Sequence, residues 1–121
     1  MNRRKTILIV DDEPRIRALF HSQIKESGYN ALEARDGDEA LQVLQKNKDI
    51  DLLILDIMLP HVSGLEIFET IKKDFSSLKI IISSVYPYEE QEFLIWDAQD
   101  YYYKSESISV LIDKINKLLK A

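Results

Sequence analysis

Chemically reactive side chains directly follow the apolar segments of this 121-residue sequence. A pair of aspartates, Asp11 and Asp12, follows the first aliphatic run, and Asp56 follows another. Ser84 is the second of two serines that follow a run of isoleucines, and Lys104 follows three consecutive tyrosines. Carboxylates can hold a divalent cation or act as nucleophiles, and hydroxyl and ammonium groups can stabilise anionic oxygens. Together these residue types indicate chemistry on a phosphoryl group.

The three aspartates would repel one another if folding brought them together in a partly desolvated site, and a divalent cation would relieve that repulsion. Oxygen ligands without His or Cys nearby favour Mg²⁺, or Mn²⁺, over zinc. We predict that Asp11 and Asp12 hold the metal while Asp56 is the nucleophile. An aspartate pair alone can also be a helix cap, and a lone lysine such as Lys104 is more often solvated. The hypothesis of a phosphoryl site therefore rests on the aspartate pair, Asp56 and Lys104 occurring together at strand ends.

The elements that must position these residues alternate between strands and helices. Short aliphatic or aromatic runs indicate strands covered on both faces, and apolar residues at helical spacing indicate the helices. The expected strands are 7–10, 30–34, 52–55, 79–82 and 101–103. The expected helices begin at Pro14 and run to Gly28, then lie around 40–44, 65–71 and 108–119, with a weakly patterned short helix between 87 and 96.

This alternation predicts an α/β fold with a parallel sheet and helices on both faces. The expected architecture is a flavodoxin-like (βα)5 three-layer sandwich whose five strands follow the order 2-1-3-4-5. In such sheets the functional crevice lies beyond the carboxyl ends of the strands, where the reactive residues fall. The length and a hydrophobic content of 45% predict one domain over residues 1–121.

Composition excludes several classes of function. The net charge is −5 and no basic stripe is present, so direct nucleic-acid binding is not expected. The aliphatic run near the N-terminus is too short for a signal peptide or a membrane span, and we expect a cytoplasmic protein. The absence of cysteine excludes disulfides and thiolate chemistry.

Over nearly its whole length the chain resembles the receiver domains of two-component response regulators. The segment 10–14, Val-Asp-Asp-Glu-Pro, is similar to the family's acidic pair, and the segment 55–60 followed by Gly64 is similar to its phosphoacceptor segment. Ser84 and Lys104 match the family's hydroxyl and lysine positions, and an Asp-Tyr pair precedes the lysine as in the family.

The resemblance implies a phosphorylation switch and not an enzyme with external turnover. A sensor histidine kinase or histidine phosphotransfer protein would donate a phosphoryl group to Asp56 with the help of Mg²⁺, and slow hydrolysis would remove it. Ser84 and Lys104 would assist the reaction, and the carbonyl of Met58 would be a further metal ligand. The Ser84 hydroxyl and the Tyr101 ring would then change position as the switch.

Two positions depart from the family pattern. Ser105 stands where the family usually has a proline after a cis peptide bond, so the loop after Lys104 is expected to be rearranged, because a cis bond before a residue other than proline costs roughly 3 kcal/mol. Val85 replaces a small residue beside the hydroxyl of Ser84 and is expected to narrow access for the phosphoryl donor.

The remaining aromatic and histidine residues admit plainer interpretations. The aromatics that precede the last helix are expected to pack against the final helices: Tyr86, Tyr88, Phe93, Trp96, Tyr101, Tyr102 and Tyr103. A sharper hypothesis leaves some of them exposed on the face formed by 87–96, 101–103 and 108–119, where receivers of this type form homodimers or bind partners. His21 and His61 have no partner pattern and are expected at the surface.

Three alternative functions remain. A Mg²⁺-dependent phosphatase-like hydrolase would need a second acid two residues after Asp56, where the chain has Met58. A flavodoxin-like cofactor binder would need a phosphate-cradling loop after the first strand, which the sequence lacks. A degenerate receiver that only docks to partners is disfavoured by the intact acidic residues. The sequence leaves open whether the natural protein is a receiver alone or carries an output domain.

Overall fold

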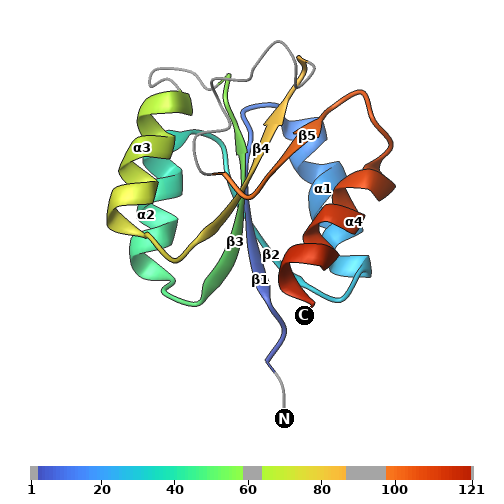
Figure 1. Ribbon diagram of the computed structural model, residues 1–121, viewed down its shortest axis with the longest axis horizontal. Helices are drawn as coiled ribbons and strands as arrows, with labels where there is room; N and C mark the ends of the chain where they lie inside the picture. Colours follow the sequence, from blue (N-terminus) through green and yellow to red (C-terminus); the bar gives the residue numbers. More distant parts are fainter. Residues whose placement is uncertain (1–2, 59–63, 87–97, 121) are drawn as a thin grey trace.

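The computed structural model describes residues 3–58, 64–86 and 98–120. Within them, five parallel strands form one sheet in the order β2-β1-β3-β4-β5, which confirms the predicted topology (Figure 1). The strands are β1 (Thr6–Val10), β2 (Asn30–Ala34), β3 (Ile50–Asp56), β4 (Lys79–Ser84) and β5 (Asp100–Tyr103), and the helices are α1 (Pro14–Glu26), α2 (Gly37–Lys46), α3 (Gly64–Asp74) and α4 (Ile108–Leu119).

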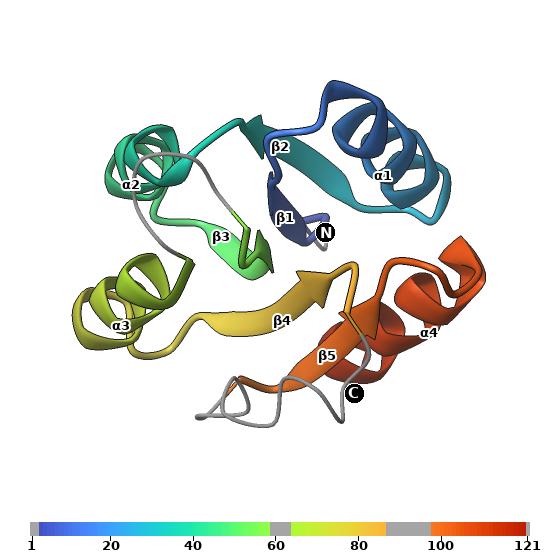
Figure 2. The same ribbon diagram turned by 90° about the horizontal axis from the view of Figure 1, so that it is seen from above.

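The sheet forms the middle layer of a three-layer sandwich. Figure 2 shows α1 and α4 on one face and α2 and α3 on the other. Side chains alternate between the faces along each strand, so β3 sends Leu53 and Leu55 toward α2 and α3 but Leu52 and Ile54 toward α1 and α4. Both faces are therefore apolar, which explains why the strands are uninterrupted aliphatic runs.

Helix α1 begins and ends where local chemistry requires it. Pro14 occupies the first turn, and the side chain of Glu13 caps the helix by accepting a hydrogen bond from the Arg15 amide. The helix ends at Glu26, two residues before the predicted limit, and Gly28 then adopts a φ of 98°, which residues with a side chain rarely accept. The first helix therefore leads directly out of the Asp11–Asp12 segment.

The structure tests some of the remaining expectations. The short helix expected between 87 and 96 lies outside the described residues, as do Tyr88, Phe93, Trp96 and His61. Tyr102 is buried against α4 as expected, and Tyr101 is buried on the opposite face, whereas Tyr86 is 41% exposed. Among the helices of the described residues, none combines the length and hydropathy needed to cross a bilayer.

Candidate functional site

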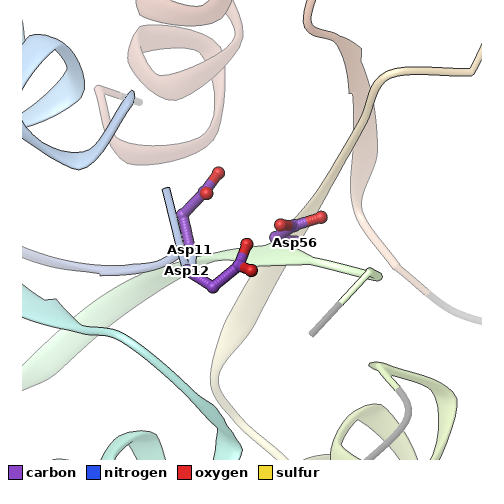
Figure 3. Close-up of side chains that lie close together, drawn as sticks. All are labelled: Asp11, Asp12 and Asp56. Carbon is purple, nitrogen blue, oxygen red and sulfur yellow. The ribbon is translucent and has the colours of Figure 1, made fainter. Parts of the chain in front are cut away.

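The carboxyl ends of the three central strands lie side by side. In the register of the sheet, Val10 of β1 pairs with Leu55 of β3, and Asp56 pairs with Ser83 of β4. The residue that follows β1, Asp11, therefore reaches the same edge as Asp56. Figure 3 shows the side chains of Asp11, Asp12 and Asp56 gathered at this edge.

The three aspartates are close enough to share one cation. One carboxylate oxygen from each of Asp11, Asp12 and Asp56 lies within 4.8 Å of the others. Opposite ligands of an octahedral Mg²⁺ ion stand about 4.2 Å apart, because each Mg–O bond is about 2.1 Å long. Asp11 and Asp56 are buried and Asp12 is exposed. The oxygen-only donor set fits a hard divalent cation.

Backbone amides hold the two buried carboxylates in place. The amide of Glu13 donates to Asp11 Oδ1 at 2.9 Å, and the amide of Met58 donates to Asp56 Oδ1 at 3.0 Å. Both bonds span two residues, a turn geometry that aspartate favours because its short side chain reaches the chain ahead. The Oδ1 atoms are thereby committed to the backbone, and the Oδ2 atoms are left for the site.

Lys104 brings a positive charge to those Oδ2 atoms. Its Nζ lies 2.7 Å from Asp11 Oδ2 and 3.3 Å from Asp56 Oδ2, and the lysine side chain is only 10% exposed. The Lys104 amide donates to the carbonyl of Ser84 at 2.7 Å, which extends the pairing of β5 with β4 up to the lysine. The Lys104 ammonium group therefore lies between the two buried carboxylates, and its positive charge stabilises their ionised forms.

Burial shapes the acidity of the central aspartate. Removal from water raises the pKa of the Asp56 carboxyl, because the ionised form is poorly solvated there. The Met58 amide and the Lys104 ammonium favour the ionised form and lower the pKa, and the negative charge of Asp11 raises it again. The net result is a pKa above the ordinary value. A perturbed carboxyl in a lined hollow is characteristic of a functional site.

A hollow of about 380 Å³ opens onto these groups and is large enough for a phosphoryl group. Asp11, Asp12, Asp56, Met58 and Lys104 line it, together with Glu13, Ile16, Val85 and Ser105. A larger hollow, of about 650 Å³, lies at the amino ends of the strands, where its lining mixes basic, acidic, neutral polar and apolar side chains. The chemistry of the lining, and not the volume, marks the smaller hollow as the candidate site.

Ser84 and Tyr101 are both tied to the backbone of Tyr86. Ser84 is fully buried, and its Oγ accepts a hydrogen bond from the Tyr86 amide at 3.0 Å. The hydroxyl of Tyr101 donates to the Tyr86 carbonyl at 2.5 Å. The backbone of Tyr86 therefore links the Ser84 hydroxyl to the buried Tyr101.

The turn after Lys104 leads from β5 toward α4. None of the peptide bonds in the described parts of the chain is cis, so the bond between Lys104 and Ser105 is trans. The turn is closed by Glu106, whose amide donates to the Tyr103 carbonyl at 2.9 Å and whose carbonyl accepts from the Tyr102 hydroxyl at 2.6 Å. Val85 is 56% exposed at the mouth of the hollow.

Two neighbours of the site were not identified from the sequence. Ser83 is 1% exposed, lies in register with Asp56, and its hydroxyl has no hydrogen-bond partner among the residues that the structure describes. Arg17 donates from Nη1 to the carbonyl of Asp11 at 2.7 Å. The two-residue period of β4 could have placed Ser83 on the face of Asp56, but no sequence pattern singles out Arg17.

His21 lies partly exposed at the surface and pairs with a carboxylate that the sequence did not indicate. Its Nδ1 is 2.8 Å from Glu33 Oε2, and its side chain is 32% exposed. Glu33 also pairs with Arg17, so the imidazole belongs to a small polar cluster beside the site.

A family comparison agrees with this geometry. The model of the response regulator receiver domain matches residues 7–116. The chain therefore belongs to the response regulator receiver family. Relatives of this receiver include the response regulator RR06 of Streptococcus pneumoniae, 32% identical over 94% of this chain and 52% of the relative. The phosphate regulon transcriptional regulatory protein PhoB of Pseudomonas aeruginosa is 35% identical over 96% of this chain and 52% of its own length.

Solved structures agree with the receiver fold. The response regulator TrrA of Thermotoga maritima, solved in complex with Mg²⁺-BeF, is 40% identical with a TM-score of 0.86 and covers 95% of this chain and 99% of its own. In a second structure TrrA is in complex with the histidine kinase ThkA, and the match covers 96% of this chain and 99% of TrrA with a TM-score of 0.87. The receiver spans 35% to 52% of the length of the first curated relatives that it matches.

Proposed function

We propose that this receiver is a phosphorylation switch in which Asp56 accepts a phosphoryl group in a Mg²⁺-dependent reaction. The observation that carries the proposal is the convergence of three carboxylates within 4.8 Å, with the Lys104 ammonium at two of them. We further propose that residues 1–121 form a single receiver domain.

The donor would be a phosphohistidine on a sensor histidine kinase or a histidine phosphotransfer protein. The relative TrrA, which was solved in complex with the histidine kinase ThkA, supports a partner of this class. An Asp56 oxygen attacks phosphorus while the other ring nitrogen of the phosphohistidine carries a proton. The bond between phosphorus and the imidazole nitrogen breaks and its electron pair stays on that nitrogen, so the leaving group is neutral imidazole. The product on Asp56 is an acyl phosphate.

Each residue of the site has a proposed part. Asp11, Asp12, Asp56 and the carbonyl of Met58 would hold the cation. Bound Mg²⁺ would neutralise the phosphoryl oxygens during transfer, and Mn²⁺ satisfies the same oxygen ligands. Lys104 would leave one of its two carboxylates to bind a phosphoryl oxygen, as a flexible lysine side chain permits. The Mg²⁺-BeF complex of TrrA supports Mg²⁺ as the cofactor.

Ser84 and Tyr101 would convert the new charge into a change of shape. If the Ser84 hydroxyl turns to bond the phosphoryl group, it must release the Tyr86 amide that it now accepts from. Tyr86 is also the acceptor of the Tyr101 hydroxyl, so the released loop frees Tyr101 to change its position. Signal output through such a shift is a change in the population of two states. A homodimer through the face formed by residues 87–96, β5 and α4 stays a prediction, and residues 87–96 lie outside the described part of the chain.

Rapid hydrolysis of phosphate esters is the less favoured function. The position two residues after Asp56 is Met58, which has no carboxyl group to protonate a leaving alcohol, and its side chain is 57% exposed at the mouth of the hollow. We therefore expect slow loss of the phosphoryl group and no turnover of external esters.

Phosphorylation by a small donor tests the proposal directly. Purified protein is incubated with acetyl phosphate or phosphoramidate and Mg²⁺, and intact mass spectrometry should find one added phosphoryl group. When the incubation contains a chelator in place of Mg²⁺, no phosphoryl group should be added. Asp56→Asn should gain none, whereas Asp38→Asn, a matched change at an exposed aspartate of α2, should behave as wild type. An unmodified wild type would favour a docking module, and a phosphorylated Asp56→Asn would identify a different acceptor.

A further inference from the structure

Arg17 lies between the cation site and the neighbouring strand β2. Its Nη1 donates to the backbone carbonyl of Asp11 at 2.7 Å, and its Nε lies 3.2 Å from Glu33 Oε1. The arginine side chain is 17% exposed, so both bonds are partly shielded from water. We propose that Arg17 is a positioning residue that presets the Asp11–Asp12 segment for the divalent cation, an inference that rests on the proposed function.

The carbonyl that Arg17 binds influences the orientation of two of the proposed metal ligands. It belongs to the peptide group that joins Asp11 to Asp12, so a donor on this oxygen fixes the peptide plane from which both carboxylates extend. Asp11 is also held by its amide, which donates to the Ala34 carbonyl at 3.1 Å, and by the Glu13 amide on Oδ1.

Asp12 lacks such supports of its own. Its side chain is exposed and makes no hydrogen bond or ion pair with any residue that the structure describes. The direction of its carboxylate therefore depends on the peptide that precedes it. A rotation of that peptide would carry the Asp12 oxygens away from those of Asp11 and Asp56.

Glu33 binds the guanidinium of Arg17 and is itself paired with His21. Glu33 Oε1 pairs with Arg17 Nε, and Glu33 Oε2 lies 2.8 Å from His21 Nδ1. The planar guanidinium can serve Asp11 and Glu33 at once because its donors point in fixed, different directions. A lysine keeps the charge but lacks this fork.

Positioning and simple electrostatics predict opposite results when Arg17 is removed. Arg17 is a cation close to an acidic cluster, so by Coulomb repulsion alone its removal should strengthen Mg²⁺ binding. If Arg17 positions the ligands, its removal should weaken binding instead. Residues behind the ligands of a metal site typically contribute about 10- to 100-fold in metal affinity.

The experiment compares Mg²⁺ dissociation constants, measured by titration calorimetry on the folded proteins well below their melting temperatures. Arg17→Ala should bind Mg²⁺ about 10- to 100-fold more weakly than wild type, and Arg17→Lys should also be weaker although its charge is unchanged. Glu33→Gln, which keeps an acceptor for Arg17, should lose less. The matched control is Arg15→Ala, an exposed arginine of the same helix, which should bind at least as tightly as wild type.

A backbone readout separates positioning from a loss of stability. In the metal-free state the amide resonance of Asp12 should shift in Arg17→Ala and Arg17→Lys but not in Arg15→Ala. If Arg17→Ala fails to fold, Arg17→Lys and Glu33→Gln decide the question. If wild type binds Mg²⁺ and the Arg17 variants bind it equally or more tightly, the positioning role of Arg17 is wrong and the proposed function still stands. A wild type that does not bind Mg²⁺ overturns the proposed function as well.

Discussion

Replacing Lys104 by methionine would leave two buried carboxylates without their counter-ion. Nζ lies 2.7 and 3.3 Å from oxygens of Asp11 and Asp56, whose side chains are 2% and 4% exposed. At an effective dielectric constant of about 20, each of these contacts corresponds to an attraction of about 5–6 kcal/mol. Desolvation of the three groups offsets much of this, and breaking a buried ion pair usually costs about 3–5 kcal/mol.

We therefore expect Lys104→Met to lower the free energy of unfolding by about 3–5 kcal/mol at pH 7 without Mg²⁺. Urea denaturation followed by circular dichroism measures this difference. The control is Lys114→Met, which removes an ion pair of similar length, 3.0 Å from Lys114 Nζ to Asp100 Oδ1, between side chains that are 25% and 34% exposed. Because water screens that pair, its loss should cost less than about 1 kcal/mol.

Mg²⁺ provides a second, independent criterion. The ammonium of Lys104 and a divalent cation compete for the same two carboxylates, so the variant should bind Mg²⁺ more tightly and recover part of its lost stability when the ion is added. Two results would refute the reasoning. One is a loss no larger than that of Lys114→Met, and the other is a gain on adding Mg²⁺ no larger than in wild type.

Three further perturbations follow from the described geometry. Burial raises the pKa of Asp56 above its ordinary value of 3.8, so ionisation of this carboxyl destabilises the metal-free fold. Asp56→Asn should therefore be more stable than wild type at pH 7 and lose this advantage as the pH falls through the raised pKa toward 3.8, as thermal unfolding across that range would show. The unpaired hydroxyl of Ser83 is costly to bury, so Ser83→Ala should raise the free energy of unfolding in urea by about 1 kcal/mol. Gly37→Ala should lower the free energy of unfolding by about 1–3 kcal/mol, because the new Cβ would stand 2.4 Å from the Cδ1 atom of the buried Ile67. A variant as stable as wild type would show that the Ile67 side chain moves aside freely.

The sheet and its active edge were predictable because both follow from one-dimensional patterns. Unbroken aliphatic runs such as Leu52–Leu55 identify buried parallel strands, and alternation with helices restricts the strand order. Once the order is known, the residues that follow the strands must converge. For this reason the sequence alone predicted that Asp11, Asp56 and Lys104 lie close together, with Ser84 on the adjacent strand.

The contacts between side chains were not predictable in the same way. The bond from Arg17 to the Asp11 carbonyl depends on the angle at which α1 leaves β1, and its pairing with Glu33 depends on how β2 lies beside that helix. Neither angle is encoded in a repeat or a motif. The attachment of the Ser84 and Tyr101 hydroxyls to the backbone of Tyr86 likewise depends on a loop conformation that hydrophobic periodicity does not describe.

The two oxygens of each buried carboxylate have different contacts, which would let the site stay ordered while the proposed cation exchanges. Asp11 Oδ1 and Asp56 Oδ1 accept hydrogen bonds from the amides two residues ahead, and those bonds need not break for chemistry to occur. Asp11 Oδ2 and Asp56 Oδ2 contact only the Lys104 ammonium among the polar groups that the structure describes. Each carboxylate is thus fixed through one oxygen, and its other oxygen contacts the ammonium at the end of the flexible Lys104 side chain. A cation or a phosphoryl group could displace that ammonium without disturbing the strands that hold the site.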